Sequence, residues 1–338
     1  MFLIFAVCSI PNSTQKKNTL AIIGADINEA KRILVKGDLV AIPTETVYGL
    51  AGNGLNQSSL QEIFKVKNRP TFNPLILHVG KMDQVTELVQ DIPSPLLRLM
   101  EHFWPGPLTV LLRKSDRVPD LVTAGSDRVA IRMPNHPLSL QLLRSLDFPL
   151  AAPSANPFTY ISPTLPEHVD KMLGDQIGYI LDGGACSAGL ESTIVGMEQG
   201  KVKIFRYGAL SVEEIQSIIN GAILLPKETD SIQGPGQLKL HYAPHTPTLL
   251  FERDTLSIED FENKHIGIIN FAEAYPGRTQ WEQRILSRSG NLKEAAAQLY
   301  QIMHEMDQMD LDLILIERLP DTELGKTMND RLERASSK

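Results

Sequence analysis

Short apolar runs alternate with segments of helical period over the first two-thirds of the chain. The apolar runs predict strands at 38–42, 75–79, 108–112, 129–133, 150–152, 178–181, 192–195 and 202–205. The segments of helical period are 58–67, 81–90, 95–103, 137–146, 167–173 and 211–220. Ser58 is the predicted N-cap of the first, and the last begins with a Ser211–Glu214 capping box. Because strands and helices do not alternate strictly, we expect a twisted, partly antiparallel α/β sheet rather than a doubly wound one.

A second, smaller α/β region follows a change of composition after Leu225. Residues 226–237 hold two Gly, two Pro and one isolated Ile among polar residues, which is typical of a linker. Beyond it, strands are predicted at 248–251, 266–270 and 313–317, and a helix runs from Asn291, with Glu294 in its first turn, to about 306. A chain of 338 residues also predicts two domains.

Charge and cysteine content restrict the class of protein. The formal net charge of −7 argues against a basic nucleic-acid coat, so any polyanion must be met by a local basic patch. Cys8 and Cys186 are the only cysteines, which indicates a reducing compartment. The apolar run 1–10 is too short to span a bilayer and makes a poor secretion signal, so we expect a buried strand or a loose extension in a soluble, cytoplasmic protein.

Common catalytic motifs are missing from the sequence. It contains no GxSxG elbow, no HExxH metal motif and no GxGxxG fingerprint. The residues 325–327 resemble the end of a P-loop, but Pro320 occupies the position of the required upstream glycine. A nucleotide would therefore have to bind without these phosphate-binding loops.

Four polar loop clusters follow predicted strands or helices instead. The first is 43–50, which is either a turn or a hydroxyl-rich rim of a pocket. The second carries Lys65, Lys67 and Arg69 and leads to His78; its cations suit either the carboxyl end of a helix or a polyphosphate.

The third and fourth clusters combine arginines with hydroxyl and amide side chains. Arg132 accompanies the proline-bounded loops 153–157 and 162–164, which either form local turns or orient a small polar substrate. The fourth cluster comprises 183–184, 189–193 and Arg206, an arginine at a strand end that is equally typical of an ordinary surface.

Seven motifs in these clusters, in this order, resemble the YrdC/Sua5 family, the L-threonylcarbamoyladenylate synthases of tRNA modification. They are PTETVYGL (43–50), KVKNRPTFNPL (65–75), WPGPLT (104–109), VAIRMPNHP (129–137), APSAN (152–156), ESTIV (191–195) and HYAPHTP (241–247). The resemblance implies the two-domain Sua5 form: a YrdC-like domain at 20–225 around a concave cavity, a linker at 226–245 that folds over the site, and a small Rossmann-like domain at 246–338.

The resemblance also implies an activity and its partners. Such an enzyme joins L-threonine, bicarbonate and ATP into threonylcarbamoyl-AMP and releases pyrophosphate. A separate transferase complex then modifies adenosine 37 of tRNA, so no stable nucleic-acid complex and no membrane are needed. Mg²⁺ is expected to arrive with ATP, since it prefers phosphate oxygens and waters and these motifs contain no carboxylate cage.

Site residues follow from the positions that match the family's motifs. The characteristic tetrad, implied to be catalytic, corresponds to Lys67, Arg69, Ser154 and Asn156. L-threonine is implied to bind at Thr44, His78, Arg132 and Ser192, and ATP at Lys67, Arg69, Ser154, Ser162, Arg206 and Tyr242. No general base is evident, so positioning and preorganised cations should carry the reaction.

Two other functions remain open from sequence. A non-catalytic RNA-binding factor would use a positive cavity, but the net charge of −7 weighs against it. A carbamoyl-transfer module acting on carbamoyl phosphate is disfavoured because the acylphosphatase and zinc-finger segments that accompany such modules are missing.

Overall fold

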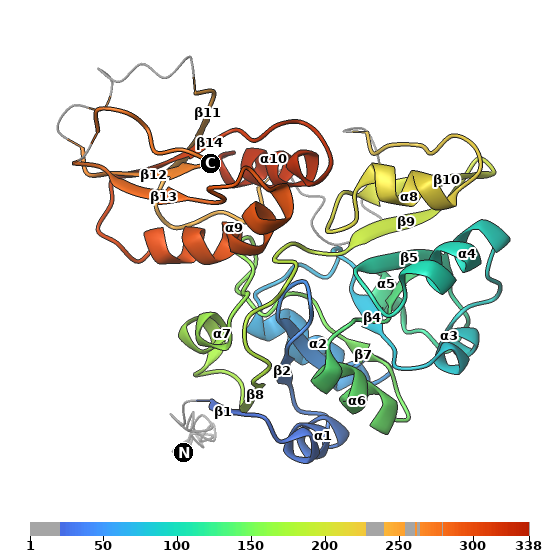
Figure 1. Cartoon of the computed structure of the whole chain (residues 1–338). Coiled ribbons are helices and arrows are strands. Elements are labelled where there is room, and N and C mark those ends of the chain that lie inside the picture. The colour runs from blue at the N-terminus through green and yellow to red at the C-terminus, as the bar shows by residue number, and fades with distance from the viewer. Residues whose placement is uncertain (1–20, 228–239, 254–260, 262–263, 279, 338) are drawn as a thin grey trace, which may run out of the picture.

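The computed structural model describes residues 21–227, 240–253, 261, 264–278 and 280–337 (Figure 1). Within them the strands form two sheets, one of ten strands from residues 22–206 and one of four from residues 248–317. The apolar run 1–10, Cys8 and most of the predicted linker (228–239) lie outside the described residues.

The large sheet is mixed, as the irregular order of strands and helices predicts. Its strand order is β1-β8-β2-β3-β7-β4-β6-β5-β9-β10. Neighbours such as β4 and β6 are parallel, whereas β5 and β6 are antiparallel. The strands are β1 (Ile22–Gly24), β2 (Val40–Ile42), β3 (Gly49–Asn53), β4 (Ile76–His78), β5 (Leu108–Arg113), β6 (Arg128–Arg132), β7 (Leu150–Ala151), β8 (Tyr179–Leu181), β9 (Thr193–Glu198) and β10 (Lys201–Arg206).

Eight helices among the described residues accompany this sheet. They are α1 (Ile27–Val35), α2 (Gln57–Val66), α3 (Met82–Leu88), α4 (Ser94–Phe103), α5 (Asp120–Thr123), α6 (Pro137–Ser145), α7 (Pro166–Leu173) and α8 (Val212–Ile218). The capping box at the start of α8 is confirmed, although the helix ends before Asn220. The predicted cap of α2 is wrong: the Asn56 side chain accepts from the Ser59 amide, and the Ser58 hydroxyl donates to Asn56 instead.

Strand β2 shows why the central strands are apolar along their whole length. Val40 and Ile42 pack into a cluster with residues of α1 and α6, whereas Ala41 packs into a cluster with residues of α2 and α4. Successive side chains of a strand point to opposite faces, so a sheet covered by helices on both faces needs apolar residues at every position. Polar residues are therefore displaced to the strand ends, where the loops begin.

The small domain is built on a wholly parallel sheet. Its order is β11-β14-β12-β13, formed by β11 (Thr248–Phe251), β12 (Ile266–Asn270), β13 (Glu282–Ile285) and β14 (Leu313–Glu317). Helices α9 (Leu292–Met306) and α10 (Leu324–Ala335) pack with it. Asn291 caps α9 as predicted, while β13 and α10 were not expected from sequence.

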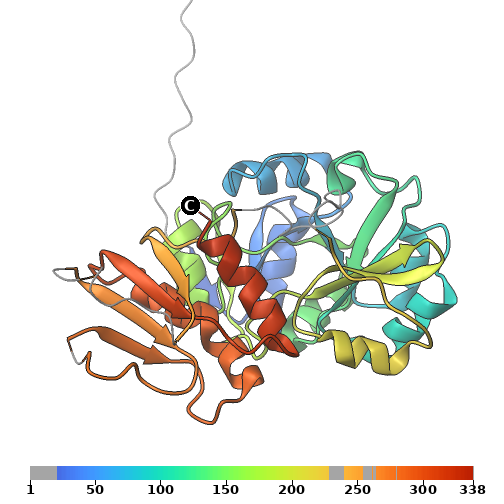
Figure 2. The same ribbon diagram turned by 90° about the horizontal axis from the view of Figure 1, so that it is seen from above.

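The two domains share a buried interface. One apolar cluster joins Val47, Ile161 and Leu190 of the large domain to residues of α9 and α10. Figure 2 shows α10 lying between the small sheet and the large one. Gly189 is required here, because its φ is +70° and a Cβ would lie 2.4 Å from the Ala296 carbonyl oxygen. None of the described helices combines the length and the apolar character needed to cross a membrane.

Two histidines meet across this interface, and their titration should make it sensitive to acid. The rings of His168 and His304 lie 4.0 Å apart. Burial first, then the neighbouring His304 and Lys171, lower the pKa of His168 to about 3. Burial also lowers the pKa of His304 to about 4, against the opposing effects of the Ser162 carbonyl and Asp307.

We expect the melting temperature to fall as the pH falls from about 6.5 toward 4. In this range the two histidines bind protons in the unfolded chain but stay neutral in the folded one, because their pKa values are lower when folded. Differential scanning calorimetry of His168→Gln/His304→Gln should show a shallower dependence on pH. His102→Gln, at an exposed histidine of α4, should keep the wild-type dependence. Equal slopes for all three proteins would contradict this assignment.

Candidate active site

A cavity lies where several strand ends of the large sheet meet the segment 240–243. Four of its lining residues are the predicted threonine-binding positions Thr44, His78, Arg132 and Ser192. Four more are among the predicted tetrad and ATP-binding positions: Arg69, Ser154, Arg206 and Tyr242. The fold thus brings together residues that lie up to 198 positions apart in the sequence.

Strand register explains part of this gathering. Thr109 of β5 pairs with Arg132 of β6, and β5 is parallel to β9, which begins next to Ser192. Strand β9 is antiparallel to β10, so the start of β9 lies beside Arg206 at the end of β10. The side chains of Arg132, Arg206, Thr109 and Ser192 therefore meet at the same end of four neighbouring strands, β6, β5, β9 and β10.

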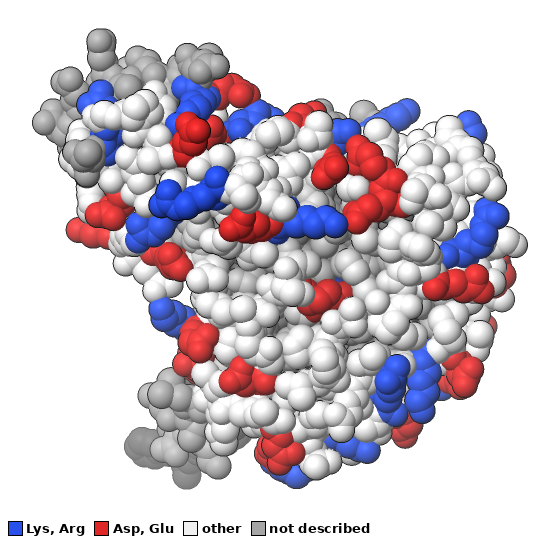
Figure 3. Space-filling model, viewed as in Figure 1, with Lys and Arg blue, Asp and Glu red and all other residues white. Residues whose placement is uncertain are grey.

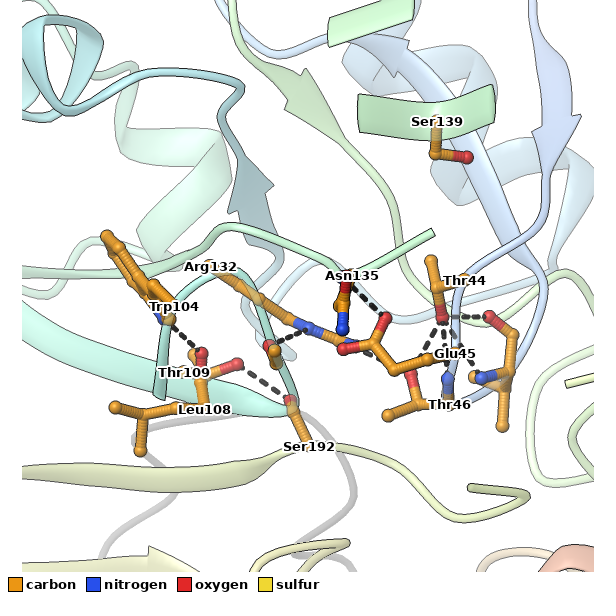
Figure 4. Close-up of polar contacts among 12 residues, drawn as sticks. Thr44, Glu45, Thr46, Trp104, Leu108, Thr109, Arg132, Asn135, Ser139 and Ser192 are labelled. Carbon is orange, nitrogen blue, oxygen red and sulfur yellow. Dashed lines mark hydrogen bonds and ion pairs between the residues drawn. The ribbon is translucent and has the colours of Figure 1, made fainter. Parts of the chain in front are cut away.

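Arg132 is held rigidly from several sides. Its side chain is 4% exposed; Nη2 lies 2.8 Å from Glu45 Oε1, and Nη1 donates to Thr46 Oγ1 at 2.8 Å. Its Nε donates to the Gly106 carbonyl, and Glu45 in turn accepts from the Asn135 amide. Figure 4 shows the guanidinium running toward Glu45 and Thr46, with the Thr109–Ser192 pair beside it. Such a side chain presents its remaining N–H groups in a fixed direction.

Thr44 combines both interpretations of the first loop cluster. Its hydroxyl accepts from the Thr46 and Val47 amides at 3.1 Å and donates to the Val47 carbonyl at 2.7 Å, which is a local turn. The residue also lines the cavity together with Thr46. The turn therefore places hydroxyl groups on the cavity wall.

Ser192 and Arg206 line the cavity side by side. The Ser192 hydroxyl is 2.7 Å from Thr109 Oγ1, and Arg206 Nη2 donates to the Ser192 carbonyl at 2.7 Å and to its hydroxyl at 3.1 Å. Burial lowers the pKa of Arg206 from its ordinary value, though an arginine so shifted still carries its charge at neutral pH.

Lys67 and Asn156 support the site from behind rather than line it. The Lys67 ammonium donates to the carbonyls of Ser154 and Asn156, both at 2.5 Å, and the residue is 1% exposed. Asn156 Nδ2 donates to the carbonyls of Pro157 and Tyr160. Burial, and then the charge of Arg69, lower the pKa of Lys67 well below its ordinary value. Both residues fix the loop that carries Ser154.

The basic cluster of the second loop is divided between solvent and site. Lys65 points outward and pairs with Glu62, with 76% of its side chain exposed. Arg69 points inward, donates to the carbonyls of Asn73 and Pro74, and lies 5.8 Å from the Phe158 ring centroid. Burial lowers the pKa of Arg69 to about 9. Only the inward cation can meet a ligand in the cavity.

The histidines of the cavity are neutral at physiological pH. Burial, followed by the charge of Arg132, lowers the pKa of His78 to about 3. Burial and the neighbouring cations, Arg69 first, lower the pKa of His241 well below its ordinary range. Their rings can accept or donate hydrogen bonds but supply no charge, so the positive potential comes from arginines.

Sequence reasoning did not assign Thr46, Glu191 and His241, which also line the cavity, nor Glu45, which pairs with the lining residue Arg132. Each lies inside or next to a quoted motif, but a carboxylate in an anion-binding site was not expected. Ser162 was expected at the cavity; it lies behind the wall instead, and its hydroxyl donates to Glu191 Oε1 at 2.7 Å. Glu45 and Glu191 are both paired with arginines, Arg132 and Arg331. Among the residues described, no group of three His, Cys, Asp or Glu is placed to hold a metal ion.

Tyr242 lines the cavity from the segment 240–243. It is 1% exposed, has a φ of 63° and lies against Arg331, whose Cζ is 4.9 Å from its ring centroid. Burial raises the pKa of its hydroxyl to about 12. The space left is about 50 Å³, enough for only a few water molecules.

Comparison with known families and relatives covers almost the whole chain. Residues 32–208 match the Sua5/YciO/YrdC family model, described as "Telomere recombination", and residues 210–337 match "Threonylcarbamoyl-AMP synthase, C-terminal domain". The threonylcarbamoyl-AMP synthase of Pyrococcus abyssi is 36% identical over 92% of this chain and 94% of its own length. That of Bacillus subtilis is 36% identical over 92% of each.

Solved structures agree with the sequence comparison. The crystal structure of P. abyssi Sua5 complexed with L-threonine superposes with a TM-score of 0.86 at 34% identity, over 94% of this chain and 98% of that one. Escherichia coli YciO matches 56% of this chain with a TM-score of 0.51 at 21% identity, which shows a shared fold.

The supporting role of Lys67 can be tested by its contribution to stability. Lys67→Met removes the donor of the Asn156 carbonyl and leaves the Ser154 carbonyl with only the Asn156 amide, and we expect it to lower the free energy of unfolding by roughly 1–3 kcal/mol, because relief from burying a cation offsets part of the loss. Lys65→Met, two residues away on the solvent side, should change it by less than about 0.5 kcal/mol. Urea denaturation measures both; equal stabilities would show that the Lys67 bonds do not hold the loop.

Proposed function

The chain belongs to the YrdC/Sua5 family of threonylcarbamoyl-AMP synthases, and on that premise we propose that it condenses L-threonine, bicarbonate and ATP into threonylcarbamoyl-AMP and pyrophosphate. The observation that carries the proposal is a cavity lined by three buried arginines, Arg69, Arg132 and Arg206, together with hydroxyl side chains. Such a set suits a small hydroxy amino acid and a polyphosphate together. A separate transferase complex would then pass the threonylcarbamoyl group to adenosine 37 of tRNA.

The proposed reaction has two bond-forming steps. The threonine amine attacks the carbon of bicarbonate, and loss of water leaves a carbamate. A carbamate oxygen then attacks the α-phosphorus of ATP, the bond from that phosphorus to the bridging oxygen breaks, and pyrophosphate departs. Negative charge grows on the phosphoryl oxygens and the leaving group, so fixed cations stabilise the transition state more than the ground state.

We propose that threonine binds at Arg132. The guanidinium has five N–H groups; Gly106 and Thr46 accept from two of them, and Nη2 faces Glu45 as an ion pair without a hydrogen bond. The others can bind the threonine carboxylate, while the hydroxyls of Thr44 and Ser192 offer partners for its amine and hydroxyl. Neutral His78 completes this side of the cavity without repelling the amine.

We propose that the phosphates of ATP bind against Arg69 and Arg206. Lys67 and Asn156 act on ATP only through the loop that carries Ser154, whose carbonyl Lys67 binds. Mg²⁺ enters as part of the ATP substrate, since Glu191, which lines the cavity, and Glu45 beside it are both paired with arginines. Because the free space is about 50 Å³, Tyr242 and its segment must withdraw to admit ATP and then return to exclude water.

The charge on one face of the molecule gives no support to the alternative of an RNA-binding factor. On the face seen in Figure 3, lysines and arginines are interspersed with aspartates and glutamates, without a broad area of one sign. Binding of an RNA backbone needs several adjacent cations and gives a steep dependence on salt. The buried arginines of the cavity are too enclosed to serve that purpose.

Mass spectrometry of the product tests the proposed reaction. The full chain, incubated with ATP·Mg²⁺, L-threonine and ¹³C-bicarbonate, should form an AMP adduct that contains the threonyl mass and one ¹³C. Omission of any one substrate should abolish the adduct. ATP consumption that is the same with and without threonine would overturn the proposal.

A matched pair of variants on one strand ties the reaction to the cavity. Arg132→Lys should raise the KM for threonine about 10–100-fold, because a lysine cannot reproduce the charge-assisted fork. Arg128→Lys, at the other end of β6 with its contact to the Met197 carbonyl, should leave that KM unchanged. Equal KM values for the two variants would remove threonine from Arg132.

A further inference from the structure

Helix α10 of the small domain sends two buried side chains into the loops of the large domain. The Thr327 hydroxyl donates to the Gly208 carbonyl at 3.0 Å, and Arg331 Nη2 donates to the Tyr207 carbonyl at 2.5 Å. Positions 327 and 331 lie one turn apart on the same helix face. Both side chains are fully enclosed, at 1% and 0% exposure. This face of α10 is therefore hydrogen-bonded to residues 207–208, which directly follow Arg206.

The same arginine reaches the cavity wall through Glu191. Arg331 Nε donates to Glu191 Oε2 at 3.0 Å, and the Tyr300 hydroxyl of α9 donates to the same oxygen at 3.1 Å. The other carboxylate oxygen accepts from Ser162 of the large domain. Burial alone raises the pKa of Glu191, but the charges of Arg331 and Arg206 and the hydrogen bonds from Ser162 and Arg331 together bring it below its ordinary value. The Glu191 carboxylate is thus ionised and is bound by side chains of both domains.

Glu191 is coupled by its backbone to two site residues. It directly precedes Ser192, and its carbonyl accepts from the Ala209 amide at 2.8 Å. Gly208 packs so closely on this segment that a Cβ there would lie 2.3 Å from Ser192 C and Thr193 N. A shift of Glu191 would therefore move Ser192 and, through 207–209, the end of the strand that carries Arg206.

Arg331 also contacts Tyr242, which lines the cavity. Its guanidinium carbon is 4.9 Å from the centroid of the Tyr242 ring, within the range of a cation–π contact. Tyr300 stacks on the same ring at 5.9 Å with an interplanar angle of 18°. One arginine of the small domain thus contacts Tyr242 directly and is linked to Ser192 through Glu191.

Stability is a poor reason for such an arrangement, because a buried ion pair often contributes no more than an apolar contact of the same size. We propose that Arg331 is a positioning residue of the reaction: through Glu191 it aligns Ser162, Ser192 and Arg206, and through its ring contact it seats Tyr242 over the substrates. The inference rests on the proposed function and gives the small domain a part in the active site.

Steady-state kinetics and calorimetry on the full chain test this role. Arg331→Met should lower kcat and raise the KM for ATP, with kcat/KM reduced about 10–100-fold at a temperature well below its melting point. Arg318→Met, in the same domain and paired only within that domain to Glu252 and Glu333, is the control and should match wild type. Arg331→Lys should recover part of the loss.

A double-mutant cycle separates positioning from simple domain attachment. Glu191→Gln and Arg331→Met should each lower the rate of adduct formation. The fold-reduction in the double variant should be much smaller than the product of the two single fold-reductions, because both substitutions break the same connection. Isothermal titration should show weaker binding of L-threonine and of a non-hydrolysable ATP analogue in both. If Arg331→Met unfolds, Tyr300→Phe, which removes one bond to Glu191, should still lower kcat/KM several-fold.

Two results have distinct meanings. Wild-type protein that forms no adduct would overturn the proposed function, and the inference with it. Wild-type protein that forms the adduct, beside folded Arg331→Met and Tyr300→Phe variants with unchanged kcat, KM and binding constants, would overturn the positioning role alone.

Discussion

The burial of several cations around one small cavity is the constraint on which the rest of the structure depends. A charge removed from water is costly unless hydrogen bonds or opposite charges replace the solvent. Here backbone carbonyls satisfy Lys67 and Arg69, Glu45 and Thr46 satisfy Arg132, and the Ser192 carbonyl satisfies Arg206. Each compensating contact also fixes a direction, so the groups that make burial tolerable preorganise the cavity for anions.

The two domains meet this constraint together. The mixed sheet brings the ends of β6 and β10 and the start of β9 to one edge, while the small parallel domain supplies the arginine that neutralises Glu191. The interface is both apolar and ionic: residues of α9 pack on the loops of the large domain, and α10 provides directed bonds.

Sequence patterns identified most elements but not their orientation. Strand β2 and helix α9 were predictable because an apolar run and an Asn cap are local signals. Helix α10 was missed because its buried face carries Thr327, Asn329 and Arg331, which weakens the apolar period. Motif order pointed to the right loops, yet whether Lys67 faces the cavity or the backbone of 154–156 depends on contacts between segments 87 residues apart. Glu191 escaped notice for the same reason, since its partner lies in the other domain.

The most direct measurement is a crystal structure of the full chain with L-threonine and a non-hydrolysable ATP analogue bound. We expect the threonine carboxylate within hydrogen-bond distance of the Arg132 guanidinium, the phosphates against Arg69 and Arg206, and Tyr242 closed over both ligands. A threonine carboxylate remote from Arg132, or phosphates bound outside this cavity, would contradict the account of how the buried cations are used.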